Sequence, residues 1–208
     1  MEGPRSNRDS MVVSEKLRRL QQDHVAPITR LVEQLRDTRR HKSIPYVDPT
    51  FGGVHARVMF LLETPARPAA LGSTMLSPDN DDGTAENLWK LYQGSGLPRD
   101  TAVHWNAVPW FMGDAKKNKN AGRSDIVDGL PWLGRMVGLL PDLRLVVTMG
   151  DIARRSFALY LLKPEARLIP WMAVAHPSGR VRSAHPELWK DIGAVFVKAA
   201  EIAHDERS

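Results

Sequence analysis

Three polar side chains that could do chemistry stand at the ends of short apolar runs. Glu63 follows the run 57–62, Asn106 lies near the end of the run 101–108, and His176 follows the run 168–175. A carboxylate accepts hydrogen bonds, an amide offers a donor and an acceptor together, and an imidazole can donate or accept. Singly, such residues at strand ends are more often structural, so their value as a site depends on whether the fold brings them together.

The apolar runs predict the strands that must position these side chains. The runs 57–62, 143–149 and 168–175 are almost continuously apolar, which is typical of strands buried on both faces of a parallel sheet. Helical patterns separate or follow the runs, at 84–96, 124–140, 151–162 and 186–204. Strands that alternate with helices predict an α/β layered domain with a mostly parallel sheet.

An open parallel sheet binds ligands beyond the carboxyl ends of its strands. Glu63, Asn106 and His176 should therefore meet at one edge, where Gly150 and Asp151 follow the remaining run. Ser124 is a plausible N-cap for the helix at 124–140. The sequence thus predicts a single site at the carboxyl edge of the sheet.

Composition limits the chemistry of this site. The 208 residues carry a net charge of +5 and include no cysteine, and the pI is 9.7. The charge favours an anionic partner such as DNA or RNA. The missing cysteines exclude a thiolate nucleophile, a disulfide and an iron–sulfur cluster. No apolar run approaches the ~20 residues of a membrane span, and the first residues lack a signal peptide, so we expect a cytoplasmic protein.

Two further segments are basic. Residues 1–45 predict a helical extension of one or two amphipathic helices interrupted at Pro27, either packed on the domain 46–208 or gripping DNA. The lysine-rich segment 113–124 predicts a loop that either contacts phosphates or is simply flexible.

Three motifs in order carry a resemblance to a known family. The segments "LLETPARPAALGS", "HWNAVPW" and "AHPSGRVRS" resemble the first motif, the strand-end asparagine and the His-Pro-Ser motif of the uracil-DNA glycosylase superfamily. The resemblance spans roughly residues 45–200. It implies a three-layer α/β/α sandwich around a four-stranded parallel sheet, and hydrolysis of the N-glycosidic bond of deoxyuridine in DNA. Since the chain has no cysteine, the implied branch is one without an iron–sulfur cluster, and neither cofactor nor metal is expected.

The resemblance also implies roles for the site residues. His176 would donate a hydrogen bond to the uracil O2 as charge develops there, and Asn106 would bind O4 and N3–H together. A carboxylate would position water and stabilise the sugar cation. Glu63 and Asp82 both match a carboxylate used in the superfamily, and nearby acidic and amide side chains compete with Asp82: Asp79, Asn80 and Asp81.

The base-binding segment departs from the pattern of the most uracil-selective branch. Ala66, beside Thr64, stands where that branch has a tyrosine that excludes a 5-methyl group, so 5-substituted uracils are possible substrates. Met75 and Leu76 stand where an aromatic side chain normally stacks on the base. Phe51 and Trp110 are the alternative platforms.

The segment after His176 is expected to be a loop that enters DNA. The wedge that fills the gap left by a flipped nucleotide falls at Arg180, beside Val181. Ser178, Arg180 and Arg182 are expected to contact DNA, single- or double-stranded, by stacking or by gripping phosphates. We expect a monomer.

Two other functions remain open on the sequence. A catalytically weak protein of the same fold would bind abasic or damaged DNA without breaking a bond. An enzyme of small nucleotides or phosphate esters would need a glycine-rich phosphate loop after the first strand, and "ETPARPAALG" is not such a loop.

Overall fold

The computed structural model of the protein describes residues 3–40, 42–113 and 121–205. Most of the lysine-rich segment, residues 114–120, lies outside these ranges, so its expected contact with phosphates is not addressed. Within the described residues, no helix combines the length and the apolar character that crossing a bilayer requires.

The central sheet has four parallel strands in the order β4-β2-β5-β6. The strands are β2 (Val58–Leu62), β4 (Ala102–Asn106), β5 (Leu145–Met149) and β6 (Trp171–Val174). Each falls within one of the four apolar runs. The register pairs Leu62 with Asn106 and Met149 with Val174, so the carboxyl ends of all four strands lie at one edge.

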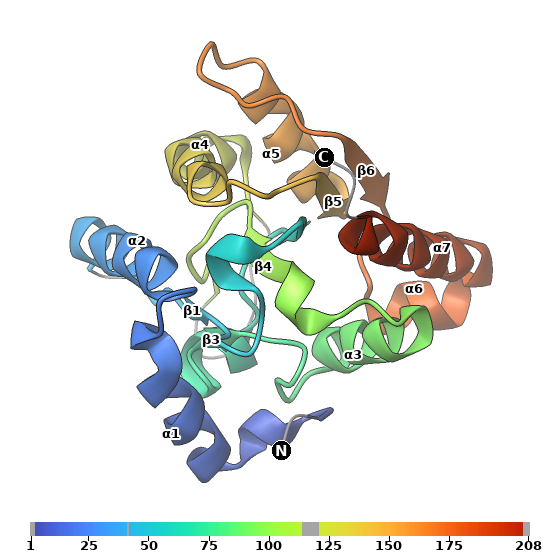
Figure 1. Ribbon diagram of the computed structural model, residues 1–208, viewed down its shortest axis with the longest axis horizontal. Helices are drawn as coiled ribbons and strands as arrows, with labels where there is room; N and C mark the ends of the chain where they lie inside the picture. Colours follow the sequence, from blue (N-terminus) through green and yellow to red (C-terminus); the bar gives the residue numbers. More distant parts are fainter. Residues whose placement is uncertain (1–2, 41, 114–120, 206–208) are drawn as a thin grey trace.

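Helices cover both faces of this sheet (Figure 1). On one face, α3 (Gly83–Ser95) packs against α7 (Pro186–His204). On the other face lie α2 (Ala26–Thr38), α4 (Arg123–Gly138) and α5 (Asp151–Leu161). The expected three-layer α/β/α sandwich is confirmed.

The strands differ in how they are covered. Every residue of β2 up to Leu61 and all of β4 and β5 are buried. In β6 the exposed fraction alternates, and Trp171 and Ala173 face solvent. The expected burial of both faces is therefore wrong for β6, because this strand lies at the edge of the sheet, although α7 packs against it and Phe157 of α5 contacts Trp171.

The N-terminal helices join the domain through both apolar and charged contacts. After η1 (Ser6–Arg8), α1 (Ser10–Arg18) and η2 (Arg19–Gln21) lead into α2. Pro27 lies in the first turn of α2, where a proline has no helical hydrogen bond to lose, and so it begins the helix rather than interrupting one. The apolar face of α2 is buried in the main core through four side chains: Ile28, Leu31, Val32 and Leu35.

Short elements complete the fold. β1 (Tyr46–Val47) pairs in parallel with β3 (Met75–Leu76), a two-stranded sheet too short to be read from periodicity. Single turns occur at η3 (Gly53–His55), η5 (Arg99–Thr101) and the π-turn η4 (Pro68–Gly72).

Two local expectations are corrected. The segment after His-Pro-Ser is not a loop but the short helix α6 (Gly179–Ala184), and Ser178 is its N-cap, with Oγ accepting from the Val181 N–H at 3.3 Å. The helix α4 has Gly122 as its N-cap, so Ser124 lies inside the first turn. Asp125 stabilises that end, because its carboxylate accepts from the Gly122 N–H at 2.9 Å.

Candidate active site

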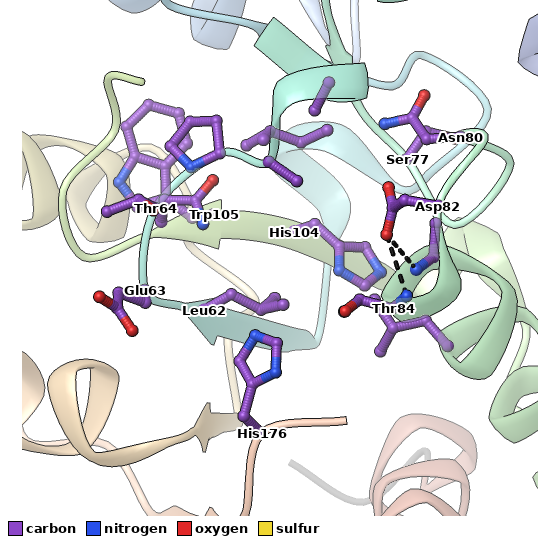
Figure 2. A pocket seen from close by; sticks show the side chains of 17 residues that line it. Leu62, Glu63, Thr64, Ser77, Asn80, Asp82, Thr84, His104, Trp105 and His176 are labelled. Atoms are coloured by element: carbon purple, nitrogen blue, oxygen red, sulfur yellow. Dashed lines mark hydrogen bonds between the residues drawn. The ribbon is translucent and has the colours of Figure 1, made fainter. Parts of the chain in front are cut away.

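A cavity of about 270 Å³ opens at the carboxyl edge of the sheet (Figure 2). Its walls come from the ends of β2 and β4, from the start of α3 and from the segment after β6. Of the site residues expected from the sequence, seven line it: Glu63, Thr64, Ala66, Leu76, Asp82, Asn106 and His176. Glu63 and His176, which are 113 positions apart in the chain, both line this cavity.

The expected base platforms are separated by the structure. Leu76 lines the cavity, whereas Met75, the preceding residue of β3, is fully buried outside it. Phe51 packs edge-on against Tyr92 and His104, and Trp110 lies under the guanidinium of Arg39. Neither ring lines the cavity, so of the expected platforms Leu76 is the one that does, beside other apolar side chains such as Leu62 and Trp105.

Asn106 ends β4 with its amide buried. The residue is 3% exposed, and its Oδ1 has no hydrogen-bond partner among the described residues. An unpaired buried acceptor costs roughly 1–3 kcal/mol, and most buried polar atoms in proteins are paired. The neighbouring backbone is fixed, because the Ala107 N–H donates to the Leu62 carbonyl at 2.8 Å. A buried amide oxygen without a described partner, on a residue that lines a cavity, is a feature expected of a ligand-binding group.

His176 lies after β6 against an unusual backbone position. Gly150 has φ +95°, and a Cβ there would lie 3.3 Å from the Cβ of His176. Glycine thus lets the histidine approach the end of β5. Burial lowers the pKa of His176, partly opposed by the charges of Glu63 and Asp82. The ring is therefore held in its neutral form, which still has one N–H to donate.

The two carboxylates of the cavity differ in how many hydrogen bonds they accept. Figure 2 shows Glu63 and Asp82 on opposite sides, with His104 and His176 between them. Asp82 is the N-cap of α3, and its Oδ1 accepts from the Thr84 N–H at 3.0 Å and the Ala85 N–H at 2.9 Å. Among the described residues, Glu63 accepts one bond, from the Ala121 N–H at 3.1 Å to Oε1. Glu63 is therefore the carboxylate with more free hydrogen-bonding capacity.

The three competitors of Asp82 have structural partners. Asp79 is ion-paired with Lys16 and Arg99, and Asp81 with arginines near the N-terminus. Neither lines the cavity. Asn80 does line it, but its amide bonds Asn7 and the Met75 carbonyl.

Sequence reasoning missed two residues here, one that holds the segment after His176 and one that lines the cavity. Asn87, in the middle of α3, is 3% exposed and donates from Nδ2 to the Pro177 carbonyl at 3.0 Å. Its Oδ1 accepts from Nη1 of Arg182 at 3.1 Å. Asparagine is a poor helix former, and its place inside a helical pattern was the available signal.

The second missed residue is His104. It lies two positions before Asn106 in β4, so both side chains project from the same face of the strand. Its ring lines the cavity. A titratable ring inside an otherwise apolar strand was the signal for this residue.

The expected DNA-binding residues differ in their neighbours. Arg182 bonds Asn87 and lies 5.8 Å from the ring centre of Trp189, turned toward α3 and α7. Both arginines are exposed, and Val181 packs against the core. Since Arg182 is bonded to Asn87, Arg180 is the more available of the two to a partner.

Possible metal ligands were compared across the described parts of the chain. No three His, Asp or Glu side chains there are grouped so that they could hold a metal ion. The chain has no cysteine, so its residues do not fit an iron–sulfur cluster.

Comparison with known proteins identifies the family. The model of the uracil DNA glycosylase superfamily matches residues 49–193. The crystal structure of Pedobacter heparinus SMUG2 shares the fold at 11% identity and a TM-score of 0.51, over 84% of this chain and 82% of that one.

A solution structure of a candidate uracil DNA glycosylase from Methanosarcina acetivorans matches 70% of this chain and 91% of its own, at 14% identity and a TM-score of 0.49. No curated protein sequence matches the chain. The family match covers well over half of the sequence and includes all three motifs, and it confirms the resemblance: this chain belongs to the uracil DNA glycosylase superfamily.

Proposed function

We propose that the protein hydrolyses the N-glycosidic bond of uracil in DNA and leaves an abasic site. The observation that carries this proposal is the buried amide of Asn106, whose Oδ1 has no partner among the described residues and which lines a cavity with Glu63 and His176. Membership of the superfamily supports the same type of activity.

The amide of Asn106 fits one edge of the base. Its oxygen would accept from N3–H of uracil while its NH₂ donates to O4. Cytosine presents an acceptor at N3 and a donor at N4, so it would leave both buried groups unpaired. Such mismatches discriminate strongly, because each unpaired group loses its hydration without gaining a partner.

His176 and Glu63 suit the two charged fragments of the transition state. As the bond to the sugar breaks, negative charge develops on the base and positive charge on the sugar. The neutral ring of His176 would donate to O2, and Glu63 would position water and stabilise the cation. A donor of this kind contributes on the order of a hundredfold in rate.

Ala66 favours a broader substrate range. Its methyl group lines the cavity beside Thr64 and leaves space next to the base. We therefore propose that uracils with a small 5-substituent are also excised.

DNA is the proposed partner, with the target nucleotide flipped into the cavity. Flipping costs a few kcal/mol in a duplex and less in a single strand. Arg180 is exposed at the start of α6, just after the His176 segment, and would contact the DNA as a wedge or at a phosphate. We propose that the protein acts as a monomer on single- and double-stranded DNA.

A direct test incubates the protein with end-labelled oligonucleotides that contain one uracil, 5-methyluracil or cytosine, in single and double strands. Alkali-labile breaks at uracil are the expected result, and Asn106→Ala is the matched inactive variant. Tight binding to uracil or abasic DNA with no excision by the parent protein would contradict the proposal and identify a binding protein instead.

A further inference from the structure

A buried polar residue of the cavity, His104, begins the segment "HWNAVPW" but has no role assigned by the resemblance. His104 is 4% exposed, lines the cavity, and shares the α3-facing side of β4 with Asn106. The ring is held by aromatic neighbours: Phe60 stacks on it with ring centroids 5.4 Å apart, and Phe51 meets it edge-on at 5.1 Å. Its orientation in the cavity is therefore fixed by packing.

The hydrogen bond to Tyr92 selects the tautomer of His104. The phenol oxygen of Tyr92 lies 2.9 Å from Nε2, and Tyr92 is itself 3% exposed. If Nε2 carried the proton, the buried phenol O–H would have no acceptor among the described residues, which is costly. The favoured arrangement has the phenol donating to Nε2, and the proton of the neutral ring then resides on Nδ1.

The Nδ1–H group is consequently free to bind a ligand. The hydrogen bond of the ring to a described residue is made by Nε2, which leaves Nδ1 without a described partner, and His104 lines the cavity. Burial lowers the pKa of His104 to about 3, so the ring stays neutral and Nδ1–H is its one spare donor at physiological pH.

We propose that His104 is a specificity-determining residue that donates from Nδ1 to the O4 keto oxygen of the base. This inference rests on the proposed function, because it assumes a uracil ring bound through Asn106. O4 has two lone pairs, so it can accept from Asn106 and His104 together. Cytosine has an amino group at this position, and its N–H would face the N–H of His104 with no acceptor between them.

The first test replaces the ring without emptying its site. His104→Phe keeps an aromatic ring among Phe51, Phe60 and Tyr92 but removes the donor. We expect the single-turnover rate on uracil to fall about tenfold to a hundredfold, and the preference for uracil over cytosine to fall with it. An unchanged rate and an unchanged preference in a folded variant would overturn the proposal.

A second variant addresses the tautomer and does not depend on the first one folding. Tyr92→Phe removes the phenol O–H and leaves the packing, so Nδ1–H is no longer enforced. We expect the imidazole ¹⁵N shifts of His104 to move toward a mixture of tautomers and the preference for uracil to weaken. Tyr160→Phe is the control, since Tyr160 is equally buried and its hydroxyl accepts from the Arg167 N–H at 3.0 Å away from the cavity.

Binding of free bases separates failure of this inference from failure of the proposed function. Free uracil should shift the Nδ1–H resonance of His104 in the parent protein, and free cytosine should not. Such a shift without any excision would refute the glycosylase activity but uphold the recognition. A different outcome would refute the recognition alone. In it, the parent protein excises uracil and Tyr92→Phe changes the tautomer of His104 as expected, but both His104→Phe and Tyr92→Phe keep the parent's preference for uracil.

Discussion

Two buried polar regions of the protein differ in how their hydrogen-bonding capacity is used. Around Lys16, the ammonium bonds Asp48 at 2.7 Å and Asp79 at 2.8 Å, and Arg99 bonds the other oxygen of Asp79 at 2.7 Å. In the cavity, Oδ1 of Asn106 has no partner among the described residues. The first region is saturated, whereas the second keeps an unused acceptor.

This difference distinguishes buried polar residues that stabilise the fold from those that are available to bind a ligand. The ion cluster links α1 to the segments after β1 and before α3, and both carboxylates are fully buried. Its charges satisfy one another, so no further partner is needed. The cavity tolerates an unpaired group, and a cost of this kind is retained in proteins mainly where function requires it. Mutations should therefore affect stability in one region and chemistry in the other.

The largest effect is expected from Lys16→Met. Removing the ammonium leaves two buried carboxylates without their shared cation, and breaking such a pair costs about 3–5 kcal/mol. Urea unfolding measures the loss, and the folded fraction should retain its rate on uracil. Lys198→Met is the matched control, because Lys198 and Glu201 form an exposed pair and its loss should change stability by less than about 1 kcal/mol.

His176→Ala is expected to slow base release by on the order of a hundredfold or more while changing DNA affinity little. The ring is assigned to charge that exists mainly in the transition state. Single-turnover kinetics measured beside the melting temperature check this. His55→Ala, an exposed histidine outside the cavity, should behave as the parent protein. A His176→Ala variant that melts at the parent temperature and excises uracil at the parent rate would contradict the role of His176 in base release.

Asn106→Ala should lower uracil excision by roughly a hundredfold with the fold intact. The unpartnered Oδ1 makes no contact that the native fold requires, so stability should not fall as it does for Lys16→Met. Asn106→Asp should also lose uracil excision, because its carboxylate cannot donate to O4. If the alanine variant excises uracil normally, Asn106 does not bind the base.

His104 should make stability depend on pH. In the unfolded chain this ring binds a proton below pH 6.5, but in the folded protein only below about 3. Between these values the unfolded state holds one more proton, so the free energy of unfolding should fall by up to about 1.4 kcal/mol per unit as pH decreases. The lowered pKa of His176 acts in the same direction.

Urea unfolding at several pH values between these limits, with His104→Phe for comparison, measures this term. The variant should have a visibly flatter dependence on pH. Equal slopes for parent and variant would mean that His104 is protonated in the folded protein.

The smallest effect is expected at α6, where two arginines can be compared. Arg180→Ala should weaken DNA binding and reduce the salt slope by about one, as for one lost phosphate contact. Arg182→Ala should leave the salt slope unchanged, because that side chain is engaged by Asn87. A salt titration of oligonucleotide binding distinguishes them, and equal slope changes would show that Arg182 leaves Asn87 to bind DNA.

The sequence alone was sufficient for the layered architecture and for grouping three polar residues of the cavity wall. Continuous apolar runs and helical periods depend on local pattern, and the parallel strands they predict must end at one edge. For this reason Glu63, Asn106 and His176 could be grouped before any coordinates were known, and the structure brings them to one cavity.

The tertiary structure decided which neighbours each side chain has, and local patterns carry no such information. It shows that Leu76 lines the cavity whereas Met75 does not. It also shows that Asp79 and Asp81 form ion pairs and that the segment after Ser178 is a helix. It also joined Asn87 to Pro177 and Tyr92 to His104. Hydrogen bonds between distant segments depend on packing in three dimensions, and only the folded chain determines which polar groups are satisfied and which remain free to bind a ligand.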